Sequence, residues 1–176
     1  MPEHRLRVLL TEEKIQSRIR GLGAEIAASY PDGTLCLIGV LKGSFLFLAD
    51  LARVIARPVR FDFVGASSYG DGMVTRGDVR LTKDADGDLR GVDILVVEDI
   101  IDTGITLSYV LDHLRSKRPR SLRVVTLLDK PEKHEREIHI DYLGFTIPNE
   151  FVVGYGMDYA EDYRYLKDIC VLDPNG

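Results

Sequence analysis

Near the middle of the chain, an apolar run leads directly into acidic residues and then into a polar turn. The string reads VVEDIIDTGITL, from Val96 to Leu107. The acids are Glu98, Asp99 and Asp102. The turn residues are Thr103, Gly104, Ile105 and Thr106. Free backbone N–H groups at the start of a helix favour a phosphate, whereas carboxylates suit ligand hydroxyls or Mg²⁺. The string therefore predicts a site for a sugar phosphate with a metal ion.

The flanking residues predict the elements that position this turn. The residues before it, Asp93 to Glu98, are apolar and β-branched apart from their ends, which predicts a strand buried on both faces. Apolar residues after it, from Leu107 to Leu114, have helical spacing. Open α/β sheets bind ligands at the carboxyl ends of their strands, so we expect the acids there. The alternative is a plain strand-to-helix turn in which Asp102 is only the helix cap.

The string closely resembles the motif with which the type I phosphoribosyltransferases bind 5-phosphoribosyl-1-pyrophosphate (PRPP). That motif has apolar residues, two acids, two apolar residues, an acid and then Thr-Gly-x-Thr, and every position is filled here. The resemblance implies an α/β fold with a central, mostly parallel sheet flanked by helices and a small hood built from N- and C-terminal segments. It implies that Asp102 to Thr106 hold the 5-phosphate and that Glu98 and Asp99 hold the ribose hydroxyls, with or without Mg²⁺. Asp102 is then also the catalytic general base or acid on the purine.

A second strand–turn–helix pattern surrounds Lys42. The apolar run Leu35 to Leu41 predicts a strand, and Phe45 opens a segment with helical spacing. A plain turn with a solvated lysine is the alternative. The turn also resembles the pyrophosphate loop of purine phosphoribosyltransferases, which implies a cis peptide bond between Leu41 and Lys42. The pyrophosphate-binding residues implied by the resemblance are Leu41, Lys42, Gly43 and Arg164.

Two further segments carry the resemblance. Residues 66–79, rich in Gly and Ser, follow a predicted strand from Val59 to Val64 and are predicted to form a mobile lid. Within them, Ser68 and Tyr69 resemble the active-site loop of the family. The lid is implied to close over the reacting centre and to exclude water. The alternative is an ordinary surface loop.

Lys130 follows a predicted strand, Leu122 to Leu128, and the run Ile138 to Phe145 predicts another strand. Residues 148–173 resemble the hood and base-binding segment of the 6-oxopurine phosphoribosyltransferases. By this resemblance Lys130 contacts the exocyclic oxygen of the purine, Phe151 stacks on the ring and the backbone of Val152 reads its edge. The implied metal ligands are Glu98, Asp99 and Asp158, with Asp158 also beside the base. From the residues alone, Lys130 is as well explained as a surface lysine and Phe151 as a core aromatic.

The composition sets broad bounds. The chain has 176 residues, of which 45% are hydrophobic, and we expect one domain, residues 1–176. The net charge of −5 argues against a nucleic-acid surface. The sequence lacks an N-terminal signal and a run of 18 apolar residues, so we expect a cytoplasmic protein without a membrane partner. Cys36 and Cys170 lie in apolar runs and are expected to be core residues.

The resemblance implies a purine salvage enzyme. It would transfer the phosphoribosyl group of PRPP to hypoxanthine, and also to guanine, giving IMP or GMP and pyrophosphate, with Mg²⁺ as cofactor. Relatives of this kind are homo-oligomers, either dimers or tetramers. Three alternatives remain open at this point: a xanthine-preferring transferase, a PRPP-sensing regulator that binds nucleic acid, and a simple phosphate-binding module.

Overall fold

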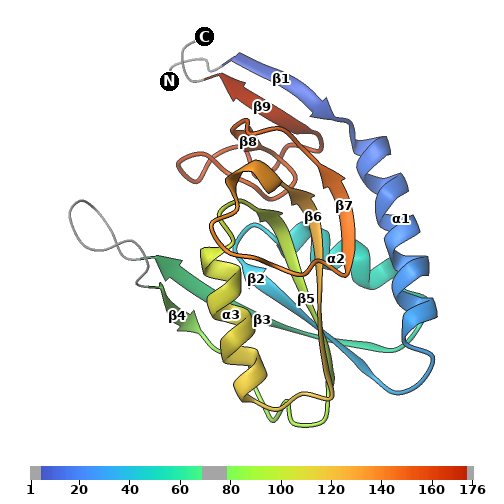
Figure 1. Cartoon of the computed structure of the whole chain (residues 1–176). Helices are drawn as coiled ribbons and strands as arrows, with labels where there is room; N and C mark the ends of the chain where they lie inside the picture. The colour runs from blue at the N-terminus through green and yellow to red at the C-terminus, as the bar shows by residue number, and fades with distance from the viewer. Residues whose placement is uncertain (1–4, 69–78, 174–176) are drawn as a thin grey trace.

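The computed structural model of the chain describes residues 5–68 and 79–173. Its centre is a six-stranded sheet with strand order β4-β3-β2-β5-β6-β7 (Figure 1). The strands are β2 (Leu35–Leu41), β3 (Val59–Ser68), β4 (Val79–Lys83), β5 (Asp93–Ile101), β6 (Ser121–Asp129) and β7 (Tyr142–Thr146). All neighbouring strands run parallel except β4, which pairs antiparallel with β3 at the edge. The predicted α/β class with a mostly parallel sheet is confirmed.

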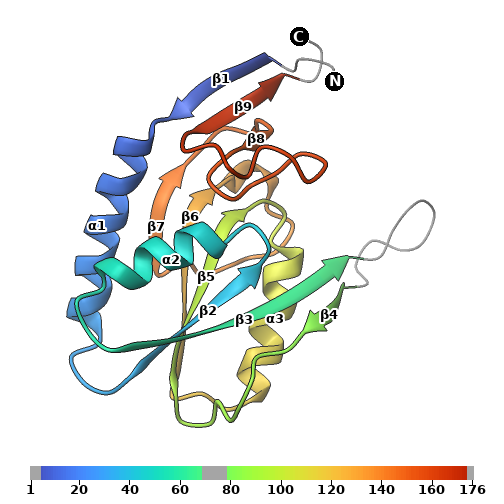
Figure 2. The ribbon, with the colours of Figure 1, turned by 180° about the vertical axis from the view of Figure 1, so that it is seen from behind.

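Helices cover both faces of this sheet. Helices α1 (Glu12–Ser29) and α2 (Phe45–Val54) lie on one face, and α3 (Ile105–Ser116) lies on the other (Figures 1 and 2). Alternate residues of the central strands point to opposite faces. In β5, Leu95 packs with the α1 and α2 residues, whereas Ile94 packs with the α3 residues. Because both faces of the central strands are covered by helices, consecutive residues of these strands must be apolar. No helix in the described part of the chain is long and apolar enough to cross a membrane.

The chain ends form a second, smaller sheet above the first. It contains β1 (Arg5–Leu10), β9 (Ile169–Asp173) and β8 (Val152–Val153), in that spatial order and antiparallel throughout (Figure 1). The predicted hood from N- and C-terminal segments is therefore confirmed. Cys170 is buried in this hood, whereas Cys36 is buried in β2, and both are free thiols.

Three predicted element boundaries were wrong. Strand β5 continues to Ile101 and does not end at Glu98, so Asp99 also lies inside the strand. Strand β3 continues to Ser68 because its last residues pair with β4, so the predicted loop cannot begin at residue 66. Strand β7 begins at Tyr142 and not at Ile138. Residues 69–78 of the predicted lid, including Tyr69, lie outside the described residues, and Val79 begins β4.

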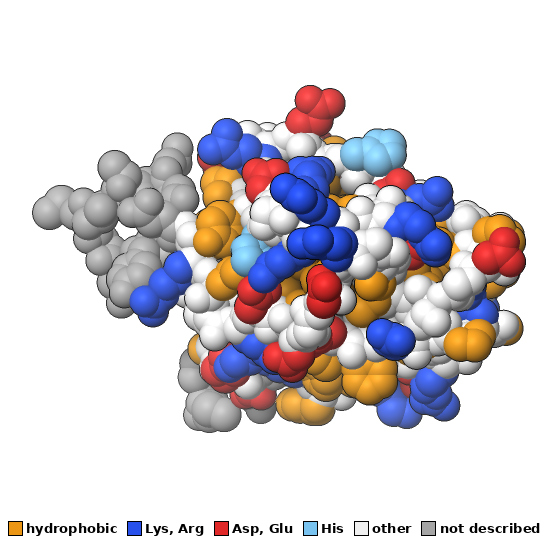
Figure 3. Space-filling model, turned by 90° about the horizontal axis from the view of Figure 1, so that it is seen from below, with side chains coloured by type: hydrophobic (Ala, Val, Ile, Leu, Met, Phe, Trp, Pro, Cys, Tyr) orange, Lys and Arg blue, Asp and Glu red, His pale blue; other side chains and the backbone are white. Residues whose placement is uncertain are grey.

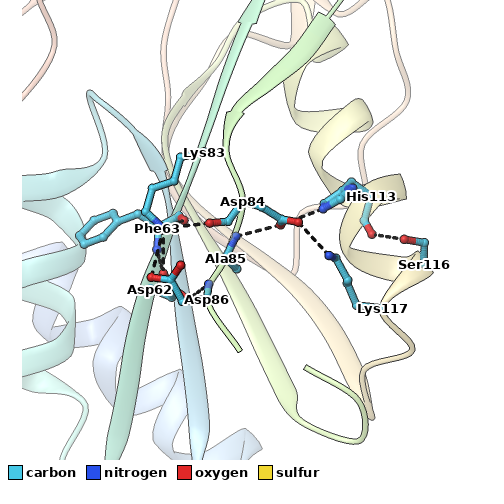
Figure 4. Close-up of polar contacts among 9 residues, drawn as sticks. All are labelled: Asp62, Phe63, Lys83, Asp84, Ala85, Asp86, His113, Ser116 and Lys117. Carbon is cyan, nitrogen blue, oxygen red and sulfur yellow. Dashed lines mark hydrogen bonds and ion pairs between the residues drawn. The ribbon is translucent and has the colours of Figure 1, made fainter. Parts of the chain in front are cut away.

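A polar cluster fixes the end of β4 against α3 (Figure 4). The Asp84 carboxylate lies 2.8 Å from His113 Nε2 and 2.8 Å from Lys117 Nζ. Lys83 Nζ donates to the Asp84 carbonyl oxygen at 2.8 Å and to the Phe63 carbonyl oxygen at 3.2 Å. The β3–β4 hairpin is thereby joined to the helix whose first turn follows Asp102.

Candidate active site

A cavity of about 750 Å³ opens between the carboxyl ends of the central strands and the hood. From the main sheet and its turns, it is lined by Lys42, Gly43, Asp99, Asp102, Lys130 and Lys133. From the segment that builds the hood, it is lined by Phe151, Val152, Met157, Asp158, Glu161 and Arg164. Most of the residues singled out in the sequence therefore meet in one place, although they lie up to 122 positions apart.

Some of the predicted residues do not line this cavity. They are Leu41, Glu98, Thr103, Gly104, Ile105 and Thr106. Leu41, Glu98 and Thr103 each adjoin a lining residue in the chain, and Gly104 to Thr106 continue the turn that begins after Asp102. Ser68 is the last residue of β3.

The turn after β5 has the backbone of a phosphate-binding loop. Helix α3 begins at Ile105 and its N-cap is Gly104, which has a φ of 78°. That left-handed conformation favours glycine. Thr103 Oγ1 accepts a hydrogen bond from the Ile105 N–H at 3.3 Å. Asp102 is therefore not the helix cap, and that alternative is wrong.

Asp102 presents a carboxylate with one paired and one unpaired oxygen. Its Oδ2 lies 3.3 Å from Lys133 Nζ, in a partly exposed ion pair. Its Oδ1 is buried and has no hydrogen-bond partner among the described residues. A buried oxygen without a donor is costly. Asp102 also lines the cavity, so its carboxylate is able to accept a hydrogen bond or a proton from a ligand once Oδ1 turns out of its buried position.

Glu98, which is buried, and Asp99, which is partly buried, form an adjacent pair of acids. Burial raises the pKa of Glu98 well above its ordinary value, and the adjacent Asp99 carboxylate raises it further. Burial also raises the pKa of Asp99, although a hydrogen bond from Glu98 opposes this shift. Ionised carboxylates in such a place are stabilised by a cation or by hydroxyl donors.

Close backbone contacts join the three walls of the cavity. A side chain on Gly43 would collide with the Asp99 carboxylate, and one on Gly156 would collide with the Gly43 carbonyl oxygen. Gly156 also has a φ of 96°. The turn after β2, strand β5 and the hood segment therefore touch where Gly43 and Gly156 lack side chains.

Two cations and two acids surround the turn after β2. The predicted cis peptide bond between Leu41 and Lys42 is confirmed. Lys42 Nζ lies 3.0 Å from both carboxylate oxygens of Glu161. Arg164 Nη2 lies 3.0 Å from Asp158 Oδ1 and 3.4 Å from Glu161 Oε2. Lys42 and Arg164 can therefore bind an anion if it displaces the carboxylates of Asp158 and Glu161 from them.

The opposite part of the cavity suits a flat, polar ring. Lys130 is 4% exposed, and burial lowers the pKa of its ammonium group, an effect that Asp102 opposes. The ammonium group makes no hydrogen bond or ion pair with any residue that the structure describes. Phe151 is 50% exposed and meets the Tyr159 ring edge-on, with centroids 5.7 Å apart. Lys130 is therefore not a surface lysine, and Phe151 is not a core aromatic.

The acids present fit a magnesium ion that a ligand helps to hold. Within residues 5–68 and 79–173, no cluster of three or more His, Cys, Asp and Glu residues could hold a metal alone. Asp99 and Asp158 nevertheless both line the cavity, and Glu98 lies beside Asp99. Mg²⁺ is commonly bound through one or two carboxylates together with substrate phosphates and waters. The donor set matches that arrangement.

Sequence reasoning missed three charged residues of the lining, Lys133, Glu150 and Glu161. Lys133 ends a short 3-10 helix, η1 (Pro131–Lys133), directly after Lys130. Glu161 lies three positions after Asp158 and three before Arg164. Their spacing of three positions from predicted site residues could have identified Lys133 and Glu161, since a tight turn places such neighbours on the same side of the chain.

Comparison with known proteins gives a consistent result. Residues 8–160 match the phosphoribosyl transferase domain family. A hypoxanthine phosphoribosyltransferase of Haemophilus influenzae is 50% identical over 169 residues, which cover 94% of each chain. A hypoxanthine-guanine phosphoribosyltransferase of Bacillus subtilis is 48% identical and covers 96% of this chain and 93% of its own. The crystal structure of a hypoxanthine-guanine phosphoribosyltransferase from Bacillus anthracis superposes with a TM-score of 0.91 at 44% identity, covering 97% of this chain and all of the other.

Proposed function

Because the chain belongs to the phosphoribosyltransferase family, with hypoxanthine-guanine enzymes among its relatives, we propose that it salvages purines. It transfers the phosphoribosyl group of PRPP to a ring nitrogen of hypoxanthine, and of guanine, releasing pyrophosphate. The observation that carries the proposal is the shared cavity. One space of about 750 Å³ is lined by acids, by anion-binding cations, by a buried lysine and by a half-exposed aromatic ring.

The 5-phosphate is assigned to the turn from Asp102 to Thr106. The free N–H groups at the start of α3, together with the Thr103 and Thr106 hydroxyls, donate to phosphate oxygens. Ile105 is assigned the same role through its backbone N–H, which donates to Thr103 Oγ1 at 3.3 Å and would have to exchange that partner for the phosphate. The positive end of the helix dipole favours the negative charge. The ribose hydroxyls then lie near Glu98 and Asp99, which accept hydrogen bonds from them.

The purine is assigned to the space between Lys130 and Phe151. The Lys130 ammonium group donates to the exocyclic oxygen of a 6-oxopurine. Phe151 stacks on the ring, and the backbone of Val152 reads its edge. Adenine carries an amino group where hypoxanthine carries the oxygen, so it would leave the lysine facing a donor.

The leaving group is assigned to Leu41, Lys42, Gly43 and Arg164. Their cations and backbone N–H groups offset the negative charge that develops on pyrophosphate. When bound, Mg²⁺ would supply further neutralisation of that charge, and Glu98, Asp99 and Asp158 are the residues that would hold it. The lid assigned to Ser68 and Tyr69 stays a prediction.

Asp102 is the residue best placed to move a proton. It lines the cavity together with Lys130, and its carboxylate can accept the hydrogen of the five-membered purine ring once the buried, unpaired Oδ1 turns toward the ligand. Holding two substrates in one closed space supplies a large part of the remaining acceleration.

The alternatives are less well supported. A nucleic-acid-binding regulator would be favoured by a basic strip, but Figure 3 shows Lys and Arg side chains interspersed with Asp and Glu on the face it displays. A phosphate-binding module does not explain a buried lysine beside an exposed aromatic ring. An enzyme assay is needed to distinguish a preference for xanthine from the proposed use of hypoxanthine and guanine.

Assembly and location belong to the same proposal. We infer a homo-oligomer, either a dimer or a tetramer, and a cytoplasmic location. The free, buried thiols of Cys36 and Cys170 suit a reducing compartment.

One assay tests the proposed function. PRPP and Mg²⁺ are supplied with hypoxanthine, guanine, xanthine or adenine in separate reactions, and pyrophosphate release is measured. We expect release with hypoxanthine and guanine and none above background with adenine. Release with none of the four purines would exclude the function, and a dominant response to xanthine would replace it with the xanthine-preferring alternative.

A further inference from the structure

The Glu161 carboxylate lies between two cations that come from distant parts of the chain. Lys42, in the turn after β2, is 119 positions away, and its Nζ lies 3.0 Å from each Glu161 oxygen. Arg164 Nη2 approaches Glu161 Oε2 at 3.4 Å. All three residues line the same cavity. One carboxylate therefore links the anion-binding groups of the main sheet to those of the hood.

The backbone around Glu161 is shaped to present this side chain. Ala160 and Glu161 have φ values of 51° and 66°. Tyr159 and Asp162 exchange backbone hydrogen bonds of 3.2 and 3.0 Å around them. A tight turn with two positive φ values ordinarily uses Asn and Gly. Strained residues of other types persist where the surroundings hold them, and they cluster at functional sites.

A hydrogen bond inside the turn fixes it further. The Glu161 N–H donates to Asp158 Oδ2 at 2.9 Å, and the other oxygen of Asp158 pairs with Arg164 at 3.0 Å. The turn, Asp158 and Arg164 thus form one unit. If only a turn were needed here, a glycine at position 161 would serve with less strain.

The contact between Glu161 and Lys42 is weak enough to be exchanged. Both side chains are 66% exposed, and ion pairs at such exposure contribute little because water and salt screen them. A diphosphate carries more negative charge and more acceptor oxygens than one carboxylate, and hydrogen bonds to charged groups are stronger than neutral ones. It can therefore take both cations from Glu161.

We propose that Glu161 is an internal competitor of the diphosphate: its carboxylate pairs with Lys42 and Arg164, and it is displaced when PRPP or pyrophosphate binds. The inference rests on the proposed transferase function and names the residue that limits diphosphate affinity at that site. Glu161 acts through the two cations, so it is a positioning residue. Its return to them after the reaction favours release of pyrophosphate.

The test compares Glu161→Gln with the wild type and with a matched control. The amide keeps the shape of the side chain and removes its charge. The control is Glu25→Gln, since Glu25 is also exposed and also pairs with an arginine, Arg18, at 2.8 Å, but does not line the cavity. Calorimetry measures the affinity for inorganic pyrophosphate with Mg²⁺, and steady-state kinetics measures KM for PRPP. We expect Glu161→Gln to bind pyrophosphate about two- to five-fold more tightly and to lower KM for PRPP similarly. The gain should shrink at high salt.

Three outcomes would overturn the inference. Unchanged affinity would show that Glu161 does not compete, and weaker affinity would show that it holds the cations in place for the ligand. A gain shared by Glu25→Gln would reduce the effect to net charge. The proposed function is judged separately, because it fails if wild-type protein releases no pyrophosphate from PRPP with any purine. The calorimetric comparison tests the role of Glu161 even if the wild-type protein releases no pyrophosphate from PRPP.

Discussion

At the scale of single residues, Asp102 combines an anchored oxygen with a free one. Lys133 holds Oδ2, while Oδ1 is buried without a partner among the described residues. A general base needs both features, because it must be oriented and still have a lone pair to offer. This difference between the two oxygens is the reason why the proton transfer is assigned to Asp102 and not to Glu98 or Asp99.

Replacing Asp102 by Asn should lower kcat by about 100-fold or more, the usual scale for loss of a general base. PRPP should still bind, because the backbone N–H groups of the phosphate turn are unchanged. Turnover is measured with saturating hypoxanthine, and PRPP affinity is measured by calorimetry. Asp112→Asn is the control, since Asp112 is exposed on α3 and pairs with Arg115 at the surface. Near-normal turnover in the Asp102 variant would remove it from the proton transfer.

Lys130 is the residue on which base recognition depends in this proposal. Its burial, without a partner in the part of the chain that is described, makes it a donor reserved for a ligand. Lys130→Ala should lower kcat/KM for hypoxanthine by the equivalent of roughly 1.5–3 kcal/mol, or a factor of about 10 to 150.

The PRPP affinity of the Lys130 variant should change much less than its hypoxanthine kinetics. The exposed Lys14, on the first turn of α1, provides the control variant Lys14→Ala. Losses of equal size in hypoxanthine use and PRPP binding would place Lys130 outside the base site.

At the scale of elements, the sequence predicted the central strands well and their ends poorly. Apolar runs fix which residues are buried, so β2 and β6 appear close to their predicted bounds. Strand ends depend on pairing with a distant partner. Gly65 to Ser68 carry no strand pattern, yet they extend β3 because β4 pairs with them.

The predicted strand from Ile138 fails for a related reason. The Asp141 carboxylate accepts the Val124 N–H at 2.8 Å, and the Asp141 N–H donates to the Val124 carbonyl oxygen at 3.0 Å. Asp141 thereby ends the β6–β7 ladder, and Ile138 and Ile140 instead pack against the residues of the α3 side. The pattern of apolar residues cannot predict that a side chain, here Asp141, will take the place of a strand's hydrogen-bonding partner.

The Asp84 cluster makes the attachment of β4 to α3 dependent on pH. Partial burial acts to raise the pKa of the Asp84 carboxyl, but hydrogen bonds from Lys117 and His113 outweigh it and lower the pKa to about 2. The ordinary value is 3.8. A depressed pKa contributes stability that is complete above the unfolded value and is lost as the pH falls through the folded value. This contribution should therefore disappear between about pH 4 and pH 2.

Asp84→Asn tests this linkage. Above pH 4 the variant should be less stable than the wild type by up to about 1 kcal/mol, since the carboxylate is partly exposed. The difference should narrow as the pH falls toward 2, as followed by urea unfolding at each pH. Asp86→Asn is the control, because the Asp86 carboxylate is 90% exposed. A difference that stays constant with pH would mean that the Asp84 charge does not stabilise the attachment.

At the scale of the whole molecule, the cavity lies between two sheets that share no strand. The main sheet supplies the phosphate turn, Lys42 and Lys130, and the hood segment supplies Phe151 and Arg164. A sequence pattern identifies each group but cannot show that β8, which carries Val152 of the lining, is held by β9. That support comes from pairing of β8 with β9 and of β9 with β1, at the two ends of the chain.

A ligand that touches both sheets should therefore stiffen the hood, and one that touches only the phosphate turn should not. We expect IMP to slow amide hydrogen exchange from Phe151 to Met157, because its purine ring packs on Phe151 while its phosphate sits at α3. Ribose 5-phosphate, at equal saturation, should protect the start of α3 only. Mass spectrometry of peptides from both regions measures the difference. Equal protection of the hood by both ligands would mean that the phosphate site alone orders it, and the purine would then have to be placed elsewhere.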